Sequence, residues 1–202
     1  MHPDISEFSS SIDNTEIVYI KNFLDKESCS YLVKAIETAL SDRSFSEELY
    51  ERINDGKATD DDSPYIYLFH YPDYQVKVIL QDIIERSISI YEDKYGKDPD
   101  INFINLGTVV TRRPGSSLNV HADDAPGLDK DVTTPHGMIL YLNDDYEGGE
   151  IYYPDLKIAI KPETGSLVIH PGTADYAHGV VPVESGIRYV TTAFTKKKIV
   201  QI

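Results

Sequence analysis

The sequence feature that most constrains the fold of this chain is a change in residue pattern at position 101. From Ile101 onward, short runs rich in β-branched and aromatic residues alternate with turn-forming residues such as Gly, Pro and Asn. About eight such runs follow one another at intervals of about 8–12 residues, which is typical of an antiparallel sandwich, jelly roll or barrel. In order, the runs are INFINLGTVV, SLNVH, GMILYLN, EIYYP, LKIAI, SLVIH, AHGVVPV and IRYVTTAF. The pattern therefore predicts an antiparallel β-core over residues 101–195.

The residues before this core show mainly helical periodicity. A strand is predicted over Ile17–Phe23, followed by a helix that starts at the capping residue Asp25 and runs to about Leu40. A second helix is predicted over Asp73–Tyr95, because apolar residues recur along one face and Gly96 follows. We expect the two helices to buttress one face of the β-core, which makes the fold class α+β.

Length and composition favour a single domain over residues 1–202. A hydrophobic fraction of 41% is enough to build one sizeable core and excludes wholesale disorder. Residues 1–15 are predicted to form a loose tail. Residues 16–100 are predicted to hold the strand, the helices and a lid-like loop at Ser41–Ser63, where the helical pattern is lost and either a solvated loop or a mobile lid follows.

The charge and cysteine content exclude several classes of partner and site. The chain has 19 Lys and Arg residues against 34 Asp and Glu residues, and its net charge of −15 repels nucleic-acid phosphates and anionic membranes. The single cysteine, Cys29, excludes an internal disulfide and a cysteine-based zinc site. We see no secretory signal in Met1–Thr15 and no apolar run long enough for a membrane span. We therefore expect a cytoplasmic protein with no nucleic-acid or membrane partner.

Three residues have the types and spacing of a metal site. His121 and Asp123 are separated by one residue at the end of a strand-like run, so their side chains point to the same face and can chelate one ion. A short H-x-D match also arises by accident in an acidic chain with six histidines. His178, several runs later, supplies the third ligand of a facial set of two histidines and one carboxylate. Such a set leaves open positions on the metal and is typical of non-haem Fe(II) oxygenases.

A cation lies in the last strand-like run. Arg188 is flanked by apolar residues in the run IRYV, and a guanidinium buried there needs an anionic partner, ideally a carboxylate held through two hydrogen bonds. The alternative is an arginine on the solvent face of an edge strand.

With His121, Asp123, His178 and Arg188 in this order, the chain resembles the Fe(II)/2-oxoglutarate-dependent dioxygenase superfamily, and more narrowly its prolyl-4-hydroxylase type. The resemblance covers most of residues 17–195 and includes several further motifs. These are Tyr141-Leu142-Asn143-Asp144 with Gly148-Gly149-Glu150, Lys161-Pro162 with Gly165-Ser166-Leu167-Val168-Ile169, Val181-Pro182-Val183 after His178, and Gly115 before His121.

The resemblance implies a double-stranded β-helix (jelly-roll) core of about eight antiparallel strands with the iron inside. It implies that His121, Asp123 and His178 ligate Fe(II) and that Arg188 pairs with the distal carboxylate of 2-oxoglutarate. Tyr141 is expected to donate its hydroxyl to the same carboxylate. O2 completes the reactant set, and ascorbate is expected to support turnover. Because halogenating relatives replace the carboxylate ligand with a small residue, Asp123 favours hydroxylation.

The chain departs from the family pattern on the substrate side. Arg112 and Arg113 stand where the family often has a tyrosine, and they either bind an acidic substrate or extra cosubstrate oxygens, or form a solvated turn. Phe194 stands in place of a family tryptophan and keeps an aromatic floor for a substrate groove. Candidate groove residues are Tyr65, Tyr67, Tyr152 and Tyr153.

Three other polar residues near these motifs receive more ordinary interpretations. His170 is predicted to be a hydrogen-bonded structural histidine, with a place behind the metal ligands as the alternative. His136 lies in a loop before a strand, where it can approach the mouth of the site. Asp124 is expected to be a solvated neighbour of Asp123, because adjacent strand residues point to opposite faces.

The function predicted on this basis is hydroxylation of a proline in a protein or peptide, most closely as a prolyl 4-hydroxylase. The reaction couples decarboxylation of 2-oxoglutarate to succinate and CO2 with hydroxylation of a C–H bond. One alternative is hydroxylation of another substrate, such as a free amino acid, a small molecule or a modified nucleic acid. The other alternative is a catalytically silent metal-binding barrel that serves as an interaction module.

Overall fold

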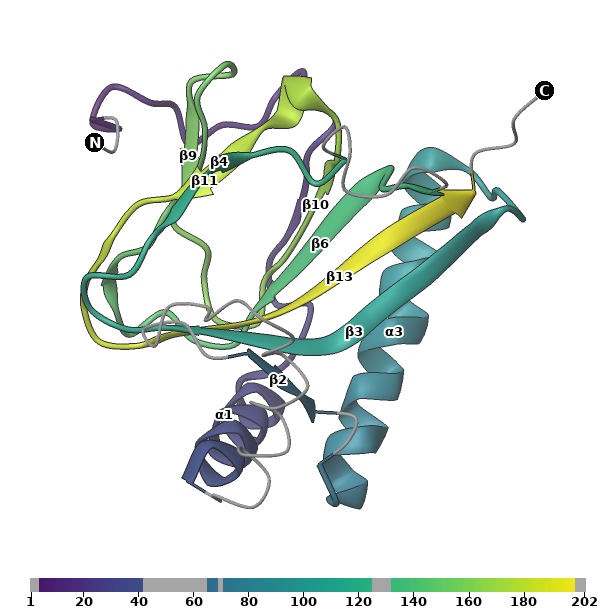
Figure 1. Cartoon of the computed structure of the whole chain (residues 1–202), viewed down its shortest axis with the longest axis vertical. Coiled ribbons are helices and arrows are strands. Elements are labelled where there is room, and N and C mark those ends of the chain that lie inside the picture. The colour runs from purple at the N-terminus through teal and green to yellow at the C-terminus, as the bar shows by residue number, and fades with distance from the viewer. Residues whose placement is uncertain (1–3, 42–64, 69–70, 125–131, 199–202) are drawn as a thin grey trace.

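A computed structural model describes residues 4–41, 65–68, 71–124 and 132–198, with backbone alone at 65–67 and 104–111. The loop predicted at Ser41–Ser63 lies outside these residues apart from Ser41 itself. Two β-sheets face each other, and two helices lie on the outer side of the larger sheet (Figure 1). This arrangement matches the predicted α+β fold with a jelly-roll core.

The two sheets gather strands that are distant in the sequence. The larger, seven-stranded sheet has the order β1 (Val18–Ile20), β10 (Leu167–Pro171), β6 (His136–Tyr141), β13 (Arg188–Lys198), β3 (Ile101–Arg112) and β2 (Tyr65–Tyr67), with β5 (Val132–Thr133) paired to β13. The four-stranded sheet has the order β4 (Leu118–His121), β11 (His178–Val180), β8 (Ile151–Tyr153) and β9 (Ile158–Ile160), and β12 (Val183–Ser185) pairs separately with β7 (Glu147–Gly148). All of these strand pairs are antiparallel. Each of the eight predicted runs contributes a strand, and the additional strands have only two or three residues.

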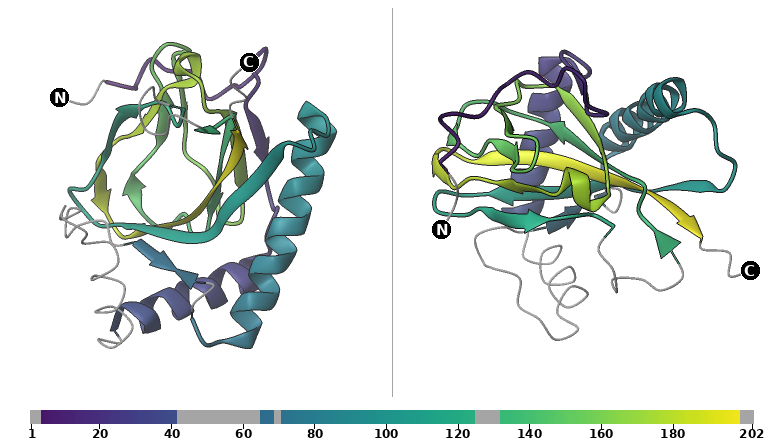
Figure 2. Two further views of the ribbon diagram at one scale, coloured as in Figure 1. Left: turned by 45° about the vertical axis from the view of Figure 1, so that its right-hand side comes forward. Right: turned by 90° about the horizontal axis from the view of Figure 1, so that it is seen from above.

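The two helices, α1 (Lys26–Ser41) and α3 (Tyr74–Tyr95), cover the outer face of the larger sheet (Figure 2). Asp25 and Asp73 precede them, and each carboxylate accepts backbone N–H hydrogen bonds from the first helical turn. Gly96, with φ of 86°, ends α3. The helix predictions are therefore confirmed to within one residue, because the signals that begin and end these helices are local. Neither of these two described helices is long and apolar enough to cross a membrane.

Side chains of the larger sheet alternate between two apolar clusters. Leu140 and Ala193 point outward and join a cluster that includes Leu32 of α1. Tyr141 and Val190 point inward and belong to a second cluster between the sheets. This alternation follows from the two-residue period of a strand, and it decides which residues of each strand can reach the interior.

The described part of the N-terminal segment is attached to the smaller sheet. Ser9 forms a parallel bridge with Ile158 in β9. The Ser9 amide donates to the Lys157 carbonyl, and the Ala159 amide donates to the Ser9 carbonyl, both at 2.9 Å. The prediction of a loose tail over residues 1–15 is therefore wrong at Ser9, because the tail satisfies backbone groups at the edge of β9.

Candidate metal centre and anion site

The register of two strands brings the predicted metal ligands together. His121 ends β4 and His178 begins β11, and the two residues are directly opposite each other in the antiparallel ladder. Asp123 follows His121 by two residues. One ligand atom of each residue can be chosen so that all three atoms lie within 4.8 Å of one another. The structure thus brings two imidazoles and one carboxylate together in the interior. We call the place where the side chains of His121, Asp123 and His178 meet the metal point.

Hydrogen bonds orient both imidazoles toward this point. Nδ1 of His121 lies 3.0 Å from the Asn119 carbonyl oxygen, and Nδ1 of His178 lies 3.2 Å from the Tyr176 carbonyl oxygen. Because a carbonyl can only accept, each Nδ1 is protonated, and in the neutral imidazole the free lone pair is then on Nε2. This is the usual way in which a protein fixes the tautomer of a metal-ligating histidine.

The electrostatics of the three residues suit a divalent cation. Burial lowers the pKa of His178 to about 3, so its imidazole is neutral. Burial opposes ionisation of Asp123, but the nearby histidines, His121 first, outweigh it and lower the carboxyl pKa. The Asp123 Oδ2 atom is buried and has no hydrogen-bond partner among the described residues. Two imidazole nitrogens and a carboxylate oxygen are a donor set that fits Fe(II).

A buried cation lies deeper in the same interior. Arg188 is 2% exposed, and its guanidinium donates to the Tyr141 hydroxyl at 3.3 Å and lies 5.0 Å from the centroid of the Tyr141 ring. No described carboxylate forms an ion pair with Arg188, and its Nε atom is buried without a hydrogen-bond partner in the described structure. A buried guanidinium without a carboxylate partner is a site for an external anion.

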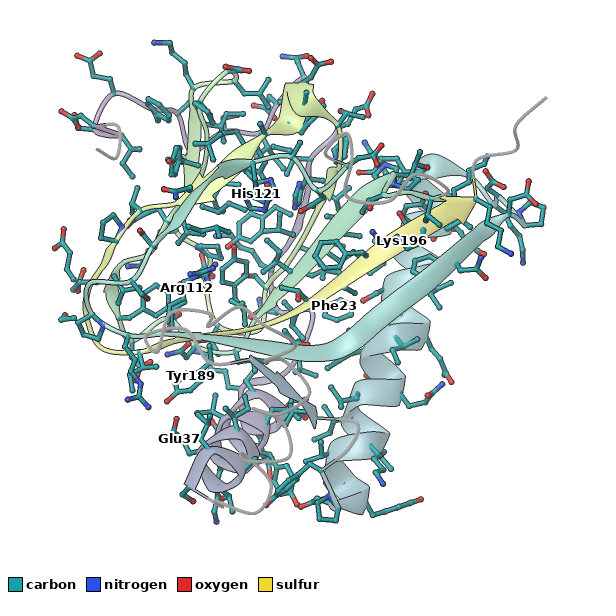
Figure 3. The ribbon with its side chains drawn as sticks, in the orientation of Figure 1. Phe23, Glu37, Arg112, His121, Tyr189 and Lys196 are labelled. Carbon is teal, nitrogen blue, oxygen red and sulfur yellow. The ribbon has the colours of Figure 1, made fainter. Side chains whose placement is uncertain are left out.

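The structure separates the two neighbouring arginines of the sequence. Arg112 is directly opposite Arg188 in the β3–β13 ladder, so it shares the inner face, and it is only 5% exposed. Its Nη1 donates to the Ser117 carbonyl at 2.8 Å. Arg113 is exposed. Figure 3 shows Arg112 and His121 on opposite sides of the interior between the sheets. The alternative of a solvated turn therefore holds for Arg113 and is wrong for Arg112.

The predicted aromatic residues lie in four different places. Tyr153 is fully buried, and its ring centroid lies 5.8 Å from that of His178. Phe194 is half-buried on the inner face, directly opposite Gly137. Tyr65 and Tyr67 belong to the edge strand β2, whose side chains lie outside the described structure. The ring of Tyr152, which precedes Tyr153 in β8, packs against Gly179.

Two residues beside the metal point have roles that the sequence does not reveal. His170 is 1% exposed, and neither of its ring nitrogens has a partner at hydrogen-bond geometry among the described residues, which favours the alternative of a place behind the metal ligands. Its ring centroid lies 4.3 Å from that of His178. The available signal was strand alternation, since His170 is two residues after the inward-pointing Val168. Asp124 is not merely solvated either, because its Oδ1 accepts the Thr134 amide at 2.9 Å.

Tyr146 is a further residue beside Arg188 that the sequence did not indicate. It is buried, and the backbone of Gly149 approaches both its ring and the Arg188 side chain so closely that an added Cβ would lie 2.9 Å from the ring and 3.1 Å from Arg188 Cδ. Because Gly149 of the Gly148-Gly149-Glu150 motif has no side chain, Tyr146 and Arg188 can pack against its backbone. No periodicity or spacing in the sequence indicates that contact.

His136 lies away from the metal point, between the larger sheet and α3. Its Nδ1 is 3.3 Å from the Tyr91 hydroxyl, and its ring centroid is 4.1 Å from that of Tyr95. Burial lowers its pKa to about 4. His136 therefore does not lie at the mouth of the site, as the sequence suggested, but in an aromatic cluster with Tyr91 and Tyr95.

This histidine makes the stability of the fold depend on pH. The unfolded chain protonates His136 near pH 6.5, whereas the folded chain resists protonation until about pH 4. The unfolded state therefore binds more protons in this window, and the free energy of unfolding is expected to fall as the pH decreases from 6.5 to 4. Urea unfolding at several pH values should show a smaller pH slope for His136→Phe than for the unmodified chain. An identical slope would show that His136 is not the group responsible.

Comparisons with known proteins agree with this geometry. Residues 107–196 match the sequence model of the 2OG-Fe(II) oxygenase superfamily, and this segment contains the histidines and aspartate of the metal point as well as Arg188. Residues 107–196 are therefore similar to a 2OG-Fe(II) oxygenase domain. The expectation of a 2-oxoglutarate-dependent dioxygenase that uses Fe(II), 2-oxoglutarate and O2 is confirmed at this level. No curated protein sequence matches the chain.

Solved structures with the same fold include three prolyl hydroxylases. A viral collagen prolyl hydroxylase from Paramecium Bursaria Chlorella virus-1, in complex with 2-oxoglutarate, has a TM-score of 0.67 at 19% identity and covers 94% of this chain and 98% of its own. A Trichoplax adhaerens prolyl hydroxylase bound to a hypoxia inducible factor peptide has a TM-score of 0.62 at 16% identity, with coverage of 91% and 84%. A Pseudomonas putida prolyl-4-hydroxylase has a TM-score of 0.56 at 14% identity, with coverage of 91% and 94%. The oxygenase domain is thus set in a fold shared with prolyl hydroxylases over nearly the whole chain.

Proposed function

We propose that the chain is an Fe(II)- and 2-oxoglutarate-dependent hydroxylase of proline in a protein or peptide. The observation that carries the proposal is the placement of His121, Asp123 and His178 in the same interior as the buried Arg188. In this proposal the two Nε2 atoms and one oxygen of Asp123 hold the iron. When bound, the iron supplies O2 activation coupled to decarboxylation of 2-oxoglutarate.

Arg188 and Tyr141, which together form the anion site, orient the cosubstrate in this proposal. Arg188 binds the distal carboxylate of 2-oxoglutarate, and the Tyr141 hydroxyl donates a second hydrogen bond to the same group. Burial raises the pKa of Tyr141, and the charge of Arg188 only partly opposes this, so the phenol keeps its proton as a donor. The keto-acid end then points toward the metal point. This geometry accounts for a guanidinium that pairs with no carboxylate of the described residues.

Arg112 is proposed to act on the same cosubstrate. It faces Arg188 across the ladder, and its charge also acts at the metal end, where it opposes the rise in the pKa of His121 that Asp123 causes. A second guanidinium on the inner face, opposite Arg188, can bind carboxylate oxygens of 2-oxoglutarate that Arg188 does not reach. Of the two roles that the sequence left open for Arg112, the proposal therefore takes the one toward the cosubstrate.

A comparison of the two neighbouring arginines tests this assignment. Arg112→Leu is expected to raise the KM for 2-oxoglutarate about tenfold, since a charge-assisted hydrogen bond contributes about 1.5 kcal/mol. Arg113→Leu is the matched control, because its side chain is exposed, and it should change that KM by less than about twofold. Thermal melts establish that both variants fold. A higher KM for the peptide alone in Arg112→Leu would assign Arg112 to the substrate instead.

Two observations support a peptide substrate: the shared fold and the solvent exposure of the metal point at His121. The His121 side chain is 39% exposed, whereas Asp123 is 6% exposed, so substrate reaches the metal past His121. Phe194 lies on the inner face of the larger sheet and is proposed as the aromatic floor of the groove, with Tyr65 and Tyr67 at its edge. The three similar structures are prolyl hydroxylases, and one of them holds a peptide, which favours a peptidyl proline.

Succinate formation from 2-oxoglutarate tests the proposed function. The protein is supplied with Fe(II), ascorbate and O2, alone and with a panel of proline-containing peptides, and each peptide has a partner in which alanine replaces proline. We expect turnover that proline peptides stimulate and alanine peptides do not, together with a +16 Da product on proline. Turnover that no peptide stimulates would remove proline peptides of this panel as substrates. Absence of any turnover in protein that binds Fe(II) would favour the silent barrel.

A further inference from the structure

His170 and the carboxylate of Asp123 meet over a residue that has no side chain. In the β10–β6 ladder, His170 is directly opposite Gly137. A Cβ added to Gly137 would lie 2.3 Å from Asp123 Oδ2 and 2.9 Å from His170 Nε2. Both polar atoms therefore occupy the space that a side chain at position 137 would fill.

The two atoms that converge there are complementary and otherwise unused. Asp123 Oδ2 and both ring nitrogens of His170 are buried and have no hydrogen-bond partner among the described residues. His170 Nε2 lies 3.8 Å from Asp123 Oδ2, just beyond hydrogen-bond distance. An unpaired donor and an unpaired acceptor that face each other in a buried interior are both penalised, and a shift of less than 1 Å removes both penalties.

The two oxygens of the Asp123 carboxylate face different histidines. Its Oδ1 lies 3.6 Å from Nε2 of His121, whereas its Oδ2 faces His170. His121 and Asp123 belong to the group whose ligand atoms gather within 4.8 Å, and His170 does not. One oxygen thus lies nearest to a proposed metal ligand and the other nearest to His170.

We propose that His170 is a positioning residue that donates a hydrogen bond from Nε2 to Oδ2 of Asp123 and so holds Oδ1 toward the metal. The inference rests on the proposed function, because it takes Asp123 as a ligand. A hydrogen bond to the outer oxygen of a ligating carboxylate restricts its rotation and lowers the entropy that metal binding must remove. Gly137 is required in this arrangement because any larger residue would separate the two groups.

Metal affinity and ligand spectra test the role without relying on turnover. Co(II) replaces Fe(II) as the probe, and its binding is titrated by the visible absorption of the bound ion under anaerobic conditions. His170→Phe keeps an aromatic ring but no donor, and it is expected to bind Co(II) about 10- to 100-fold more weakly and to show an altered spectrum. His170→Gln keeps a donor and should recover part of the affinity. His136→Phe, which changes a half-buried histidine outside the metal point, is the matched control and should bind like the unmodified chain.

Each result of this experiment decides between the inference and its alternatives. Unchanged Co(II) affinity and spectrum in His170→Phe would overturn the inference and leave the proposed function in place. Failure of the unmodified chain to bind one Co(II) would overturn the proposed function and the inference together. Pulsed EPR of the Cu(II)-loaded protein counts imidazole ligands, and three of them, falling to two in His170→Gln, would make His170 a ligand rather than a positioning residue. If His170→Phe does not fold, His170→Leu takes its place in the same comparison with His170→Gln.

Discussion

An Asp123→Ala variant is expected to lose Fe(II)-dependent succinate formation by about a thousandfold or more while it keeps the fold. The variant removes the carboxylate of the proposed metal point. The metal contribution to the reaction amounts to several kcal/mol, of which each 1.36 kcal/mol is a factor of ten in rate. The fold should persist because Asp123 belongs to neither apolar cluster of the described core. Succinate assays at saturating 2-oxoglutarate, with circular dichroism on the same samples, measure both properties.

Metal-dependent stability provides a second readout for the same variant. At a metal concentration 100 times the dissociation constant, binding stabilises a folded protein by about 2.7 kcal/mol. The unmodified chain should therefore melt at a higher temperature with Mn(II) present, and Asp123→Ala should not. Asp124→Asn is the matched control, because it keeps the oxygen that accepts the Thr134 amide and lies next to the proposed ligand. Full activity in Asp123→Ala would contradict the ligand assignment.

An Arg188→Leu variant is expected to raise the KM for 2-oxoglutarate about 10- to 150-fold, with a much smaller change in kcat. The expected size follows from the loss of a charge-assisted hydrogen bond, which contributes about 1.5–3 kcal/mol. A larger effect on KM than on kcat indicates an interaction made equally in the ground state and the transition state. Initial rates over a range of 2-oxoglutarate concentrations separate the two constants.

Arg188→Lys distinguishes charge from geometry at this position. Lysine keeps the positive charge but lacks the planar pair of donors, so we expect a KM between those of the unmodified chain and Arg188→Leu. The leucine variant also removes the donor to the Tyr141 hydroxyl, and a melting curve shows whether the buried tyrosine tolerates this loss. An unchanged KM in a folded Arg188→Leu variant would move the cosubstrate anchor to Arg112.

Several features of this protein could be predicted from the sequence because they depend on neighbouring residues. The ends of α1 and α3 follow from side chains that cap the first turn, such as Asp73, and from Gly96 at the end of α3. The shared face of His121 and Asp123 follows from the two-residue period of a strand. The order of His121, Asp123, His178 and Arg188, with the motifs around them, indicated the oxygenase superfamily, which the match over residues 107–196 confirms.

Other features required the pairing of strands that lie far apart in the chain. Arg112 and Arg113 look alike in the sequence, and only the register of β3 against β13 turns Arg112 inward to face Arg188. The attachment of Ser9 to β9 likewise depends on an edge that the local sequence does not reveal. Long-range pairing of this kind cannot be inferred from local propensity, because it is decided by the sum of contacts over a whole sheet.

His170 shows this division most clearly. The sequence placed it in a strand-like run, either as a structural histidine or behind the metal ligands. Only the tertiary structure decided what it faces, because the β10–β6 register sets Gly137 opposite it and the turn after β4 brings Asp123 into the space that the glycine leaves. Local sequence thus determined the elements and the chemical types at the site. The pairing of distant strands decided which of those groups lie within reach of one another, since hydrogen bonds and metal coordination depend on distances of a few ångströms.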